Sequence, residues 1–148
     1  MHVRPALPAD LDFIVTANMR LAEETEQVLL DEPTLREGVL AIFKGLAPGR
    51  YWLVEQEGRV IGQLLITFEW SDWRNRMVWW IQSVYVVQDA RQRGAFLALY
   101  AHVRREAQAG GAGGLRLYVD TTNTRAQAVY TAMGMNGGHY RVFEEMFS

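Results

Sequence analysis

The chain has 148 residues, no cysteine and a formal net charge of −2. A length of about 150 residues favours one domain spanning residues 1–148, which can bury enough surface to need no disulfide or structural metal. The lack of cysteine excludes thiol catalysis, the slightly acidic balance disfavours a nucleic-acid partner, and no apolar run approaches the roughly 18 residues of a membrane span. With no signal-peptide pattern at residues 1–13, a cytoplasmic location without a membrane partner is expected.

The first third of the sequence predicts a short strand and two helices. HVRPA at residues 2–6 favours a strand, and Asp10 is a typical N-cap for a helix that continues to about Leu30. Pro33 in a first helical turn and the apolar stripe of PTLREGVLAIFKGL predict the second helix.

The middle of the chain predicts an antiparallel meander. RYWLVEQ and RVIGQLLITFEW, joined at the Glu57-Gly58 turn, favour a hairpin. After the polar turn SDWRNR, the run MVWWIQSVYVV favours a third long strand. Adjacent residues of that strand, such as Trp79 and Trp80, are expected on opposite faces.

The last third returns to alternating helices and strands. Residues 91–107 have helical apolar spacing, and LRLYVD then favours a strand. NTRAQAVYTAMG predicts a short helix with Asn123 as N-cap and Gly134 just beyond its end, and HYRVFEEMF is expected as a last strand. The whole order predicts a mixed α/β sheet with helices on both faces.

The turn before the third predicted helix is a candidate anion site. Arg91, Arg93 and Gly94 lie where the strand meets the helix, and helix-terminal N–H groups beside two arginines suit a phosphate. This stretch alone leaves open the alternative of an ordinary turn with two solvated arginines. A dinucleotide fingerprint needs three glycines and a P-loop needs a lysine, so neither motif is present.

Two motifs resemble those of the GNAT N-acetyltransferase superfamily. VYVV followed by Arg91-x-x-Gly94-x is similar to the acyl-CoA signature of that family. A second motif, N-x-x-A-x-x-x-Y-x-x-x-G-hydrophobic, is similar to the downstream motif and consists of Asn123, Ala126, Tyr130, Gly134 and Met135. Both motifs occur in the expected order, and the order of elements resembles the family over nearly the whole chain.

The resemblance implies a GNAT-like fold with acetyl-CoA as co-substrate and no metal. The central sheet would be mixed and mostly antiparallel, with six or seven strands, helices on both faces and a splay between the fourth and fifth strands. Phe96 departs from the family pattern, which has a small residue at that position. The implied cofactor-binding residues are Val84, Tyr85, Val86, Arg91, Gln92, Arg93, Gly94, Ala95, Phe96, Asn123 and Tyr130.

The implied reaction transfers an acetyl group to a primary amine of a small molecule or peptide by direct attack. A backbone N–H within residues 84–86 would polarise the thioester carbonyl. Tyr130 would protonate the departing thiolate, because a phenol with a pKa of about 10 stays protonated at neutral pH. Two alternatives stay open. Tyr130 could be a tyrosine of the apolar core with no part in catalysis, and Asn123 could cap its helix without contacting the cofactor.

The general base and the residues that bind the acceptor amine are the least determined. Family members often carry a glutamate on the fourth strand, but Trp80 stands near that position. Glu69 is the candidate catalytic base, Glu24 and Glu26 are alternatives lining the same cleft, and a water relay is a further alternative. Carboxylates and aromatic faces attract cationic amines. The expected acceptor-binding residues are Glu26, Glu69, Trp70, Asp72 and Trp80.

Two other functional classes remain open. The chain could be a non-catalytic acyl-CoA-binding or sensor module on the same fold, or a structural domain that carries the motifs by chance. Release of free thiol with any amine would separate an enzyme from a sensor. The acceptor could be a polyamine, an aminoglycoside, an amino acid or a protein N-terminus, and a homodimer is a further expectation because dimers are common in the family.

Overall fold

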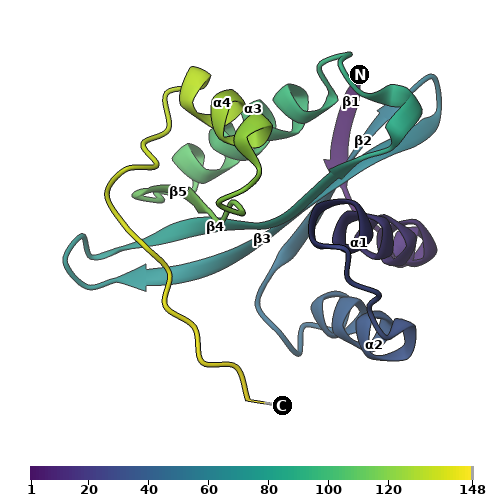
Figure 1. Cartoon of the computed structure of the whole chain (residues 1–148), viewed down its shortest axis with the longest axis horizontal. Helices are drawn as coiled ribbons and strands as arrows, with labels where there is room; N and C mark the ends of the chain where they lie inside the picture. Colours follow the sequence, from purple (N-terminus) through teal and green to yellow (C-terminus); the bar gives the residue numbers. More distant parts are fainter. Residues whose placement is uncertain (148) are drawn as a thin grey trace. The chain divides into compact units, whose positions relative to one another are not determined.

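The computed structural model describes residues 1–147, which contain five strands and four α-helices (Figure 1). Two short 3-10 turns, Pro8–Asp10 and Gln88–Ala90, accompany them. In chain order the elements are β1 (His2–Pro5), α1 (Leu11–Glu26), α2 (Glu32–Phe43), β2 (Arg50–Gln56), β3 (Arg59–Ser71), β4 (Arg76–Val86), α3 (Ala95–Ala109), β5 (Gly114–Leu117) and α4 (Thr124–Ala132).

The chain divides into two compact units, and each is described by itself. The first is Met1–Tyr118, which holds the whole sheet with α1, α2 and α3, and the second begins at Val119 and holds α4. The single domain expected over residues 1–148 stays a prediction.

The sheet has the order β1-β2-β3-β4-β5. Strands β1 to β4 pair antiparallel in sequence, and β5 lies parallel to β4. A mixed, mostly antiparallel sheet was expected, but the prediction of six or seven strands is wrong for the described residues, which form five. The last strand expected at HYRVFEEMF is absent, because residues 135–147 pair with no strand that the structure describes. Aromatic and β-branched residues favour a strand, yet a strand exists only where a neighbouring strand completes its hydrogen bonds.

Alternating residues of β2 pack on opposite faces of the sheet. On one face, Tyr51 and Leu53 of β2 pack with Ile14 of α1 and with α2. Trp52 of β2 belongs with Leu99 of α3 to the larger apolar cluster, which also extends to Ala17 of α1. Helices α1 and α2 therefore cover one face, and α3 covers the opposite face (Figure 1).

Local signals explain where the helices begin and end. Pro33 lies in the first turn of α2, as expected, and the Asp31 carboxylate caps that helix by accepting from the Thr34 N–H at 3.1 Å. Helix α1 ends at Glu26 instead of near Leu30, because Gln27 adopts a left-handed φ of 54°. No helix within residues 1–147 combines the length and apolar character that a membrane crossing requires.

The second half of β4 has one unpaired edge. Pairing between β4 and β5 covers only residues 78–81 of β4, and it ends at the Ile81–Leu117 pair. Residues 83–86 of β4 pair with β3, and Gln82 lies at a register shift in that pairing. None of residues 82–86 pairs with another strand among residues 1–147. This edge leads directly into the turn before α3.

Candidate functional site

The turn from β4 to α3 has two residues with left-handed backbone conformation. Gln92 has a φ of 64°, and Gly94, the N-cap of α3, has a φ of 87°. No side chain caps the helix, and a Cβ added at Gly94 would meet nothing within 4 Å. The N-terminus of a 15-residue helix therefore borders open space, and free N–H groups at such a terminus attract anions.

The next two residues anchor this turn on α3. Ala95 is buried, and the Phe96 ring centroid lies 6.1 Å from that of Tyr100, one helical turn later. The side chain that departs from the family pattern thus packs against a residue one turn later on its own helix, with the two rings tilted. Arg93 is exposed, and its guanidinium makes no hydrogen bond or ion pair with the residues that the structure describes.

Tyr85 is the one fully buried side chain among the three strand residues expected at the cofactor. Val84 and Val86 are half-buried, whereas Tyr85 is 5% exposed and packs in the apolar cluster with Ala17 of α1. Tyr85 also lines a cavity of about 230 Å³ with Arg20 and other α1 and β3 residues. The sequence motif concerned only the backbone of Tyr85, so its side-chain role was not foreseen.

Glu24, near the end of α1, contacts both Tyr85 and Arg91. Its Oε2 accepts from the Tyr85 hydroxyl at 2.5 Å, and its Oε1 pairs with Arg91 Nη2 at 2.7 Å. Arg91 Nε also donates to the Val86 carbonyl at 2.9 Å, and the Arg91 guanidinium lies 5.2 Å from the Tyr85 ring centroid. Glu24 of α1 therefore forms one polar cluster with Tyr85 and Arg91, which lie more than 60 positions later in the sequence, at the end of β4.

The pKa values of Glu24 and Tyr85 are shifted in opposite directions. Burial acts to raise the pKa of Glu24, but hydrogen bonds from Tyr85 and Arg91 outweigh it and hold the pKa below its usual value. Burial, and then the Glu24 carboxylate, raise the pKa of Tyr85. At neutral pH Glu24 is therefore a carboxylate and Tyr85 a neutral hydrogen-bond donor.

Glu69, the expected base, is held in an ion pair across the sheet. Its carboxylate on β3 accepts from Arg116 Nη1 of β5 at 2.5 Å, spanning the intervening strand β4. Trp80 stands beside Arg116 in the β4–β5 register, and its ring centroid lies 4.7 Å from that of Tyr118. Arg116 was not foreseen, although it is the only charged residue of the β5 strand.

The remaining acceptor candidates are dispersed on exposed surface. Glu26 is the last residue of α1, and Trp70 and Asp72 lie where β3 passes into its hairpin with β4. No hydrogen bond or ion pair among the described residues joins these side chains to Glu69 or Glu24. Within residues 1–147, no three His, Cys, Asp or Glu side chains gather as a metal site requires.

The second unit carries the other two expected cofactor residues. Asn123 caps α4, accepting from the Ala126 N–H at 3.1 Å, and Gly134 beyond the helix has a φ of 91°, as predicted from the sequence. Tyr130 lies on α4, and burial raises the pKa of its phenol. The phenol is therefore protonated at neutral pH.

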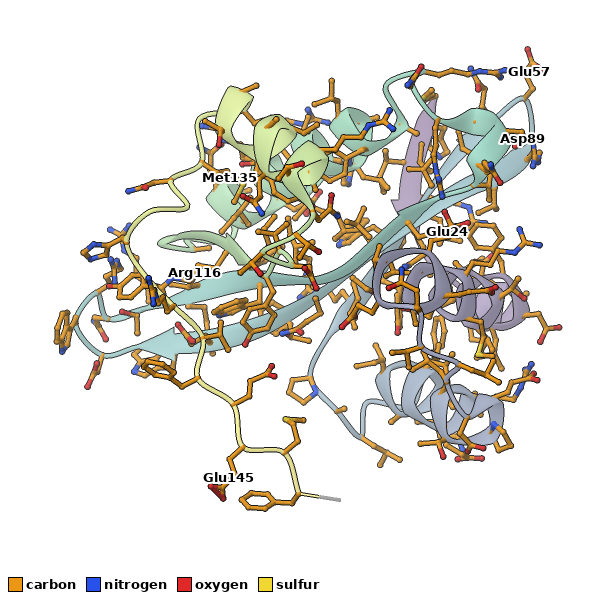
Figure 2. The ribbon with its side chains drawn as sticks, viewed as in Figure 1. Glu24, Glu57, Asp89, Arg116, Met135 and Glu145 are labelled. Carbon is orange, nitrogen blue, oxygen red and sulfur yellow. The ribbon has the colours of Figure 1, made fainter. Side chains whose placement is uncertain are left out.

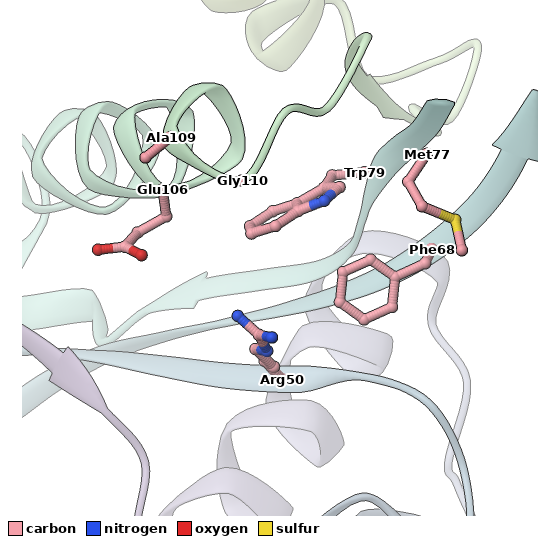
Figure 3. Close-up of a pocket in the computed structure, with 7 residues that line it drawn as sticks. All are labelled: Arg50, Phe68, Met77, Trp79, Glu106, Ala109 and Gly110. Atoms are coloured by element: carbon pink, nitrogen blue, oxygen red, sulfur yellow. The ribbon is translucent and has the colours of Figure 1, made fainter. Parts of the chain in front are cut away.

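A larger cavity, of about 540 Å³, lies on the α3 face of the sheet (Figure 3). It is lined by Phe68, Trp79, Met77 and the end of α3, and the Arg50 guanidinium lies 5.8 Å from the centroids of both aromatic rings. Because Phe68 and Glu69 are adjacent on β3, this cavity and the Glu69–Arg116 pair lie on opposite faces.

Comparison with known proteins places this arrangement in a family. The family model described as "Acetyltransferase (GNAT) family" matches residues 16–135. The crystal structure of a possible acetyltransferase from Clostridium difficile 630 has 36% sequence identity and a TM-score of 0.91, covering 99% of this chain and 97% of that one. A comparison with curated proteins gave no match.

More distant structures share the fold alone. An aminoglycoside N-acetyltransferase in complex with CoA is 17% identical with a TM-score of 0.81, covering 98% of this chain and 93% of that one. A ribosomal-protein-alanine N-acetyltransferase from Brucella melitensis is 12% identical with a TM-score of 0.77, covering 99% and 100%. Together with the match over residues 16–135, the comparisons establish that this chain belongs to the GNAT acetyltransferase family.

Proposed function

We propose that the protein is an N-acetyltransferase that moves an acetyl group from acetyl-CoA to a primary amine by direct attack. The observation that carries this proposal is one continuous segment with two binding features. The unpaired edge of residues 82–86 leads into a turn with left-handed residues Gln92 and Gly94 at the start of α3. Family membership supports the same reaction class.

The turn fits the pyrophosphate of the cofactor. Open space beside Gly94, the N-terminus of α3 and the exposed Arg93 together offer N–H donors and positive charge to an anion. Gln92, Ala95 and Phe96 complete the turn through their backbone. The side chains present leave this space free, so the residues fit the group that the family implies.

The β4 edge fits the pantetheine arm. An extended chain can add to an open strand edge through main-chain hydrogen bonds, and a backbone N–H within residues 84–86 would then polarise the acyl carbonyl. When bound, acetyl-CoA supplies an acetyl group activated as a thioester. The short β4–β5 pairing supports a splay of the sheet at this point.

Tyr130 is the proposed proton donor to the CoA sulfur. Its raised pKa favours a phenol that keeps its proton until the thiolate leaves. Asn123 already caps α4, and a cofactor contact would use the remaining hydrogen-bonding capacity of its amide.

The proton lost by the amine is proposed to leave through water. Glu69 on β3 is the carboxylate proposed to accept it from that water. The ion pair with Arg116 favours a relayed role over direct abstraction, because the Glu69 carboxylate is already engaged by an arginine at 2.5 Å. Trp70, Asp72, Trp80 and Glu26 remain proposed contacts for the acceptor. The protein is further proposed to act in the cytoplasm, and a homodimer is compatible with the proposal.

A thermal-melt comparison with acetyl-CoA, CoA and NAD tests the cofactor. A ligand at a hundred times its dissociation constant adds about 2.7 kcal/mol, which raises the Tm of a domain of this size by about 5–10 °C. We expect a shift with both CoA ligands and none with NAD. No shift with either CoA ligand would overturn the proposal. Amine-dependent thiol release would then separate the enzyme from a non-catalytic acyl-CoA sensor, which binds but releases nothing.

A further inference from the structure

Glu24 lies between the two parts of the cofactor segment. One carboxylate oxygen of Glu24, which is labelled in Figure 2, accepts from Tyr85, on the β4 edge. The other oxygen pairs with Arg91, in the turn before α3. Glu24 itself belongs to α1, which covers the opposite sheet face from α3. A single carboxylate of α1 therefore contacts both the strand and the turn.

The Arg91 guanidinium already has two hydrogen-bond acceptors. Its Nε donates to the Val86 carbonyl, and its Nη2 donates to Glu24. The side chain of Arg91 is 39% exposed, and that of Glu24 is 38% exposed. A guanidinium has five N–H donors, so donors remain for a third acceptor. A phosphate at the turn and the Glu24 carboxylate would nevertheless compete for the same positive charge.

We propose that Arg91 is shared between Glu24 and the cofactor pyrophosphate, so that acyl-CoA binding releases the Glu24 carboxylate to bind the ammonium group of a cationic acceptor. This inference rests on the proposed function and adds to it a cationic acceptor and a coupling between the cofactor and that acceptor. Each of the two ligands would therefore bind more tightly when the other is present.

The groups around Glu24 suit this role. Besides Arg91, the cations that act on Glu24 include Arg20, one helical turn earlier on α1. When Arg91 turns to phosphate, Glu24 Oε1 loses its partner at 2.7 Å, while Tyr85 still orients Oε2. A partly buried carboxylate that loses a cation gains affinity for another cation, such as a protonated amine. Because coupling between two ligands is reciprocal, the bound amine would also strengthen cofactor binding.

If Arg91 instead kept its contact with Glu24 when the cofactor binds, removing the Glu24 charge would change CoA affinity in the opposite direction. If Glu24 only positioned Arg91 for the phosphate, removing the Glu24 charge would leave Arg91 misplaced and would weaken CoA binding. If Glu24 competes for Arg91, removing its charge strengthens CoA binding. The sign of one change in affinity therefore distinguishes the two arrangements.

The test is CoA binding by calorimetry to the wild type, Glu24→Gln, Arg91→Ala and the double variant. We expect Glu24→Gln to bind CoA about three to five times more tightly, or about 0.7–1 kcal/mol at 1.4 kcal/mol per tenfold. In the Arg91→Ala background the same change should have almost no effect, because the competition needs the guanidinium.

Glu23→Gln is the matched control. It removes the same charge one residue earlier on α1, where the Glu23 side chain makes no hydrogen bond or ion pair with the described residues. Its effect on CoA affinity should be less than about twofold, because exposed charges are strongly screened at physiological salt. An equal gain in Glu23→Gln would attribute the effect to net charge and overturn the sharing of Arg91.

A second readout is the pKa of Glu24, followed by carbon NMR of its carboxyl group. Saturating CoA should raise this pKa as the Arg91 hydrogen bond is lost. An unchanged pKa, or weaker or unchanged CoA binding by Glu24→Gln, overturns the inference while the proposed function stands. Failure of the wild type to bind CoA overturns both.

Discussion

Replacing Gly94 by alanine tests whether the turn before α3 needs its left-handed backbone. Gly94 has a φ of 87°, and a Cβ there would meet nothing within 4 Å. The substitution therefore creates no steric clash with the rest of the protein, and its cost is the backbone conformation alone. For an L-residue that cost is about 1–2 kcal/mol, which lowers the Tm by about 2–8 °C for a chain of this size.

Gly38→Ala is the matched control for this variant. Gly38 lies inside α2 without a left-handed φ, and its added Cβ also meets nothing within 4 Å. The same chemical change should therefore stabilise the protein by about 0.5–1 kcal/mol, because glycine in a helix interior is less favourable than alanine. The two variants should move the Tm in opposite directions.

Thermal and denaturant unfolding measure both variants, and calorimetry with CoA follows. Gly94→Ala should also bind CoA more weakly than Gly38→Ala, because its methyl group enters the open space at the N-terminus of α3. Equal stability of Gly94→Ala and the wild type would show that this turn does not hold the left-handed conformation, and the argument for a phosphate site there would fail with it.

Three further changes are expected to have distinct effects. Tyr130→Phe should cut amine-dependent thiol release by about a hundredfold or more while CoA affinity stays near the wild-type value; full turnover would remove Tyr130 from the chemistry. Gln92→Gly should stabilise the fold by about 0.5–1 kcal/mol in denaturant unfolding, because it relieves a φ of 64°; a loss of stability would contradict this. Asp10→Asn should destabilise at pH 7, because Arg4 holds the pKa of Asp10 below its usual value. That stabilisation is present above the unfolded pKa of about 3.9 and is lost as the pH falls through the lower folded pKa. The unfolding free energies of the variant and the wild type should therefore converge in acid. A difference that persists at the lowest pH would refute the assignment.

The fold was largely predictable from local pattern. Periodicity located the helices and the β2–β3–β4 meander, and specific residues marked ends, such as Pro33 in α2 and Asn123 at α4. The prediction failed where structure depends on distant partners. HYRVFEEMF contains aromatic and β-branched residues that strands favour, but no local pattern within a segment supplies the neighbour that completes its hydrogen bonds.

The backbone of the candidate turn was easier to predict than its side-chain contacts. The change from strand to helical periodicity located the junction, and Gly94 has the left-handed φ that glycine adopts without strain. The Glu69–Arg116 and Glu24–Tyr85 contacts join residues 47 and 61 positions apart. Such pairings arise from strand register and helix placement, which a single sequence does not encode locally.

The two candidate carboxylates differ in the cation that neutralises each, and this difference decides which can respond to the cofactor. Arg116, the partner of Glu69, belongs to β5 and lies outside the proposed phosphate turn. Arg91, the partner of Glu24, is the first residue of the turn motif. An anion bound at the turn would therefore change the charge balance at Glu24 far more than at Glu69. Of the two carboxylates, only Glu24 would be presented to an amine as a consequence of cofactor binding, and Glu69 would serve as a constant part of the sheet surface.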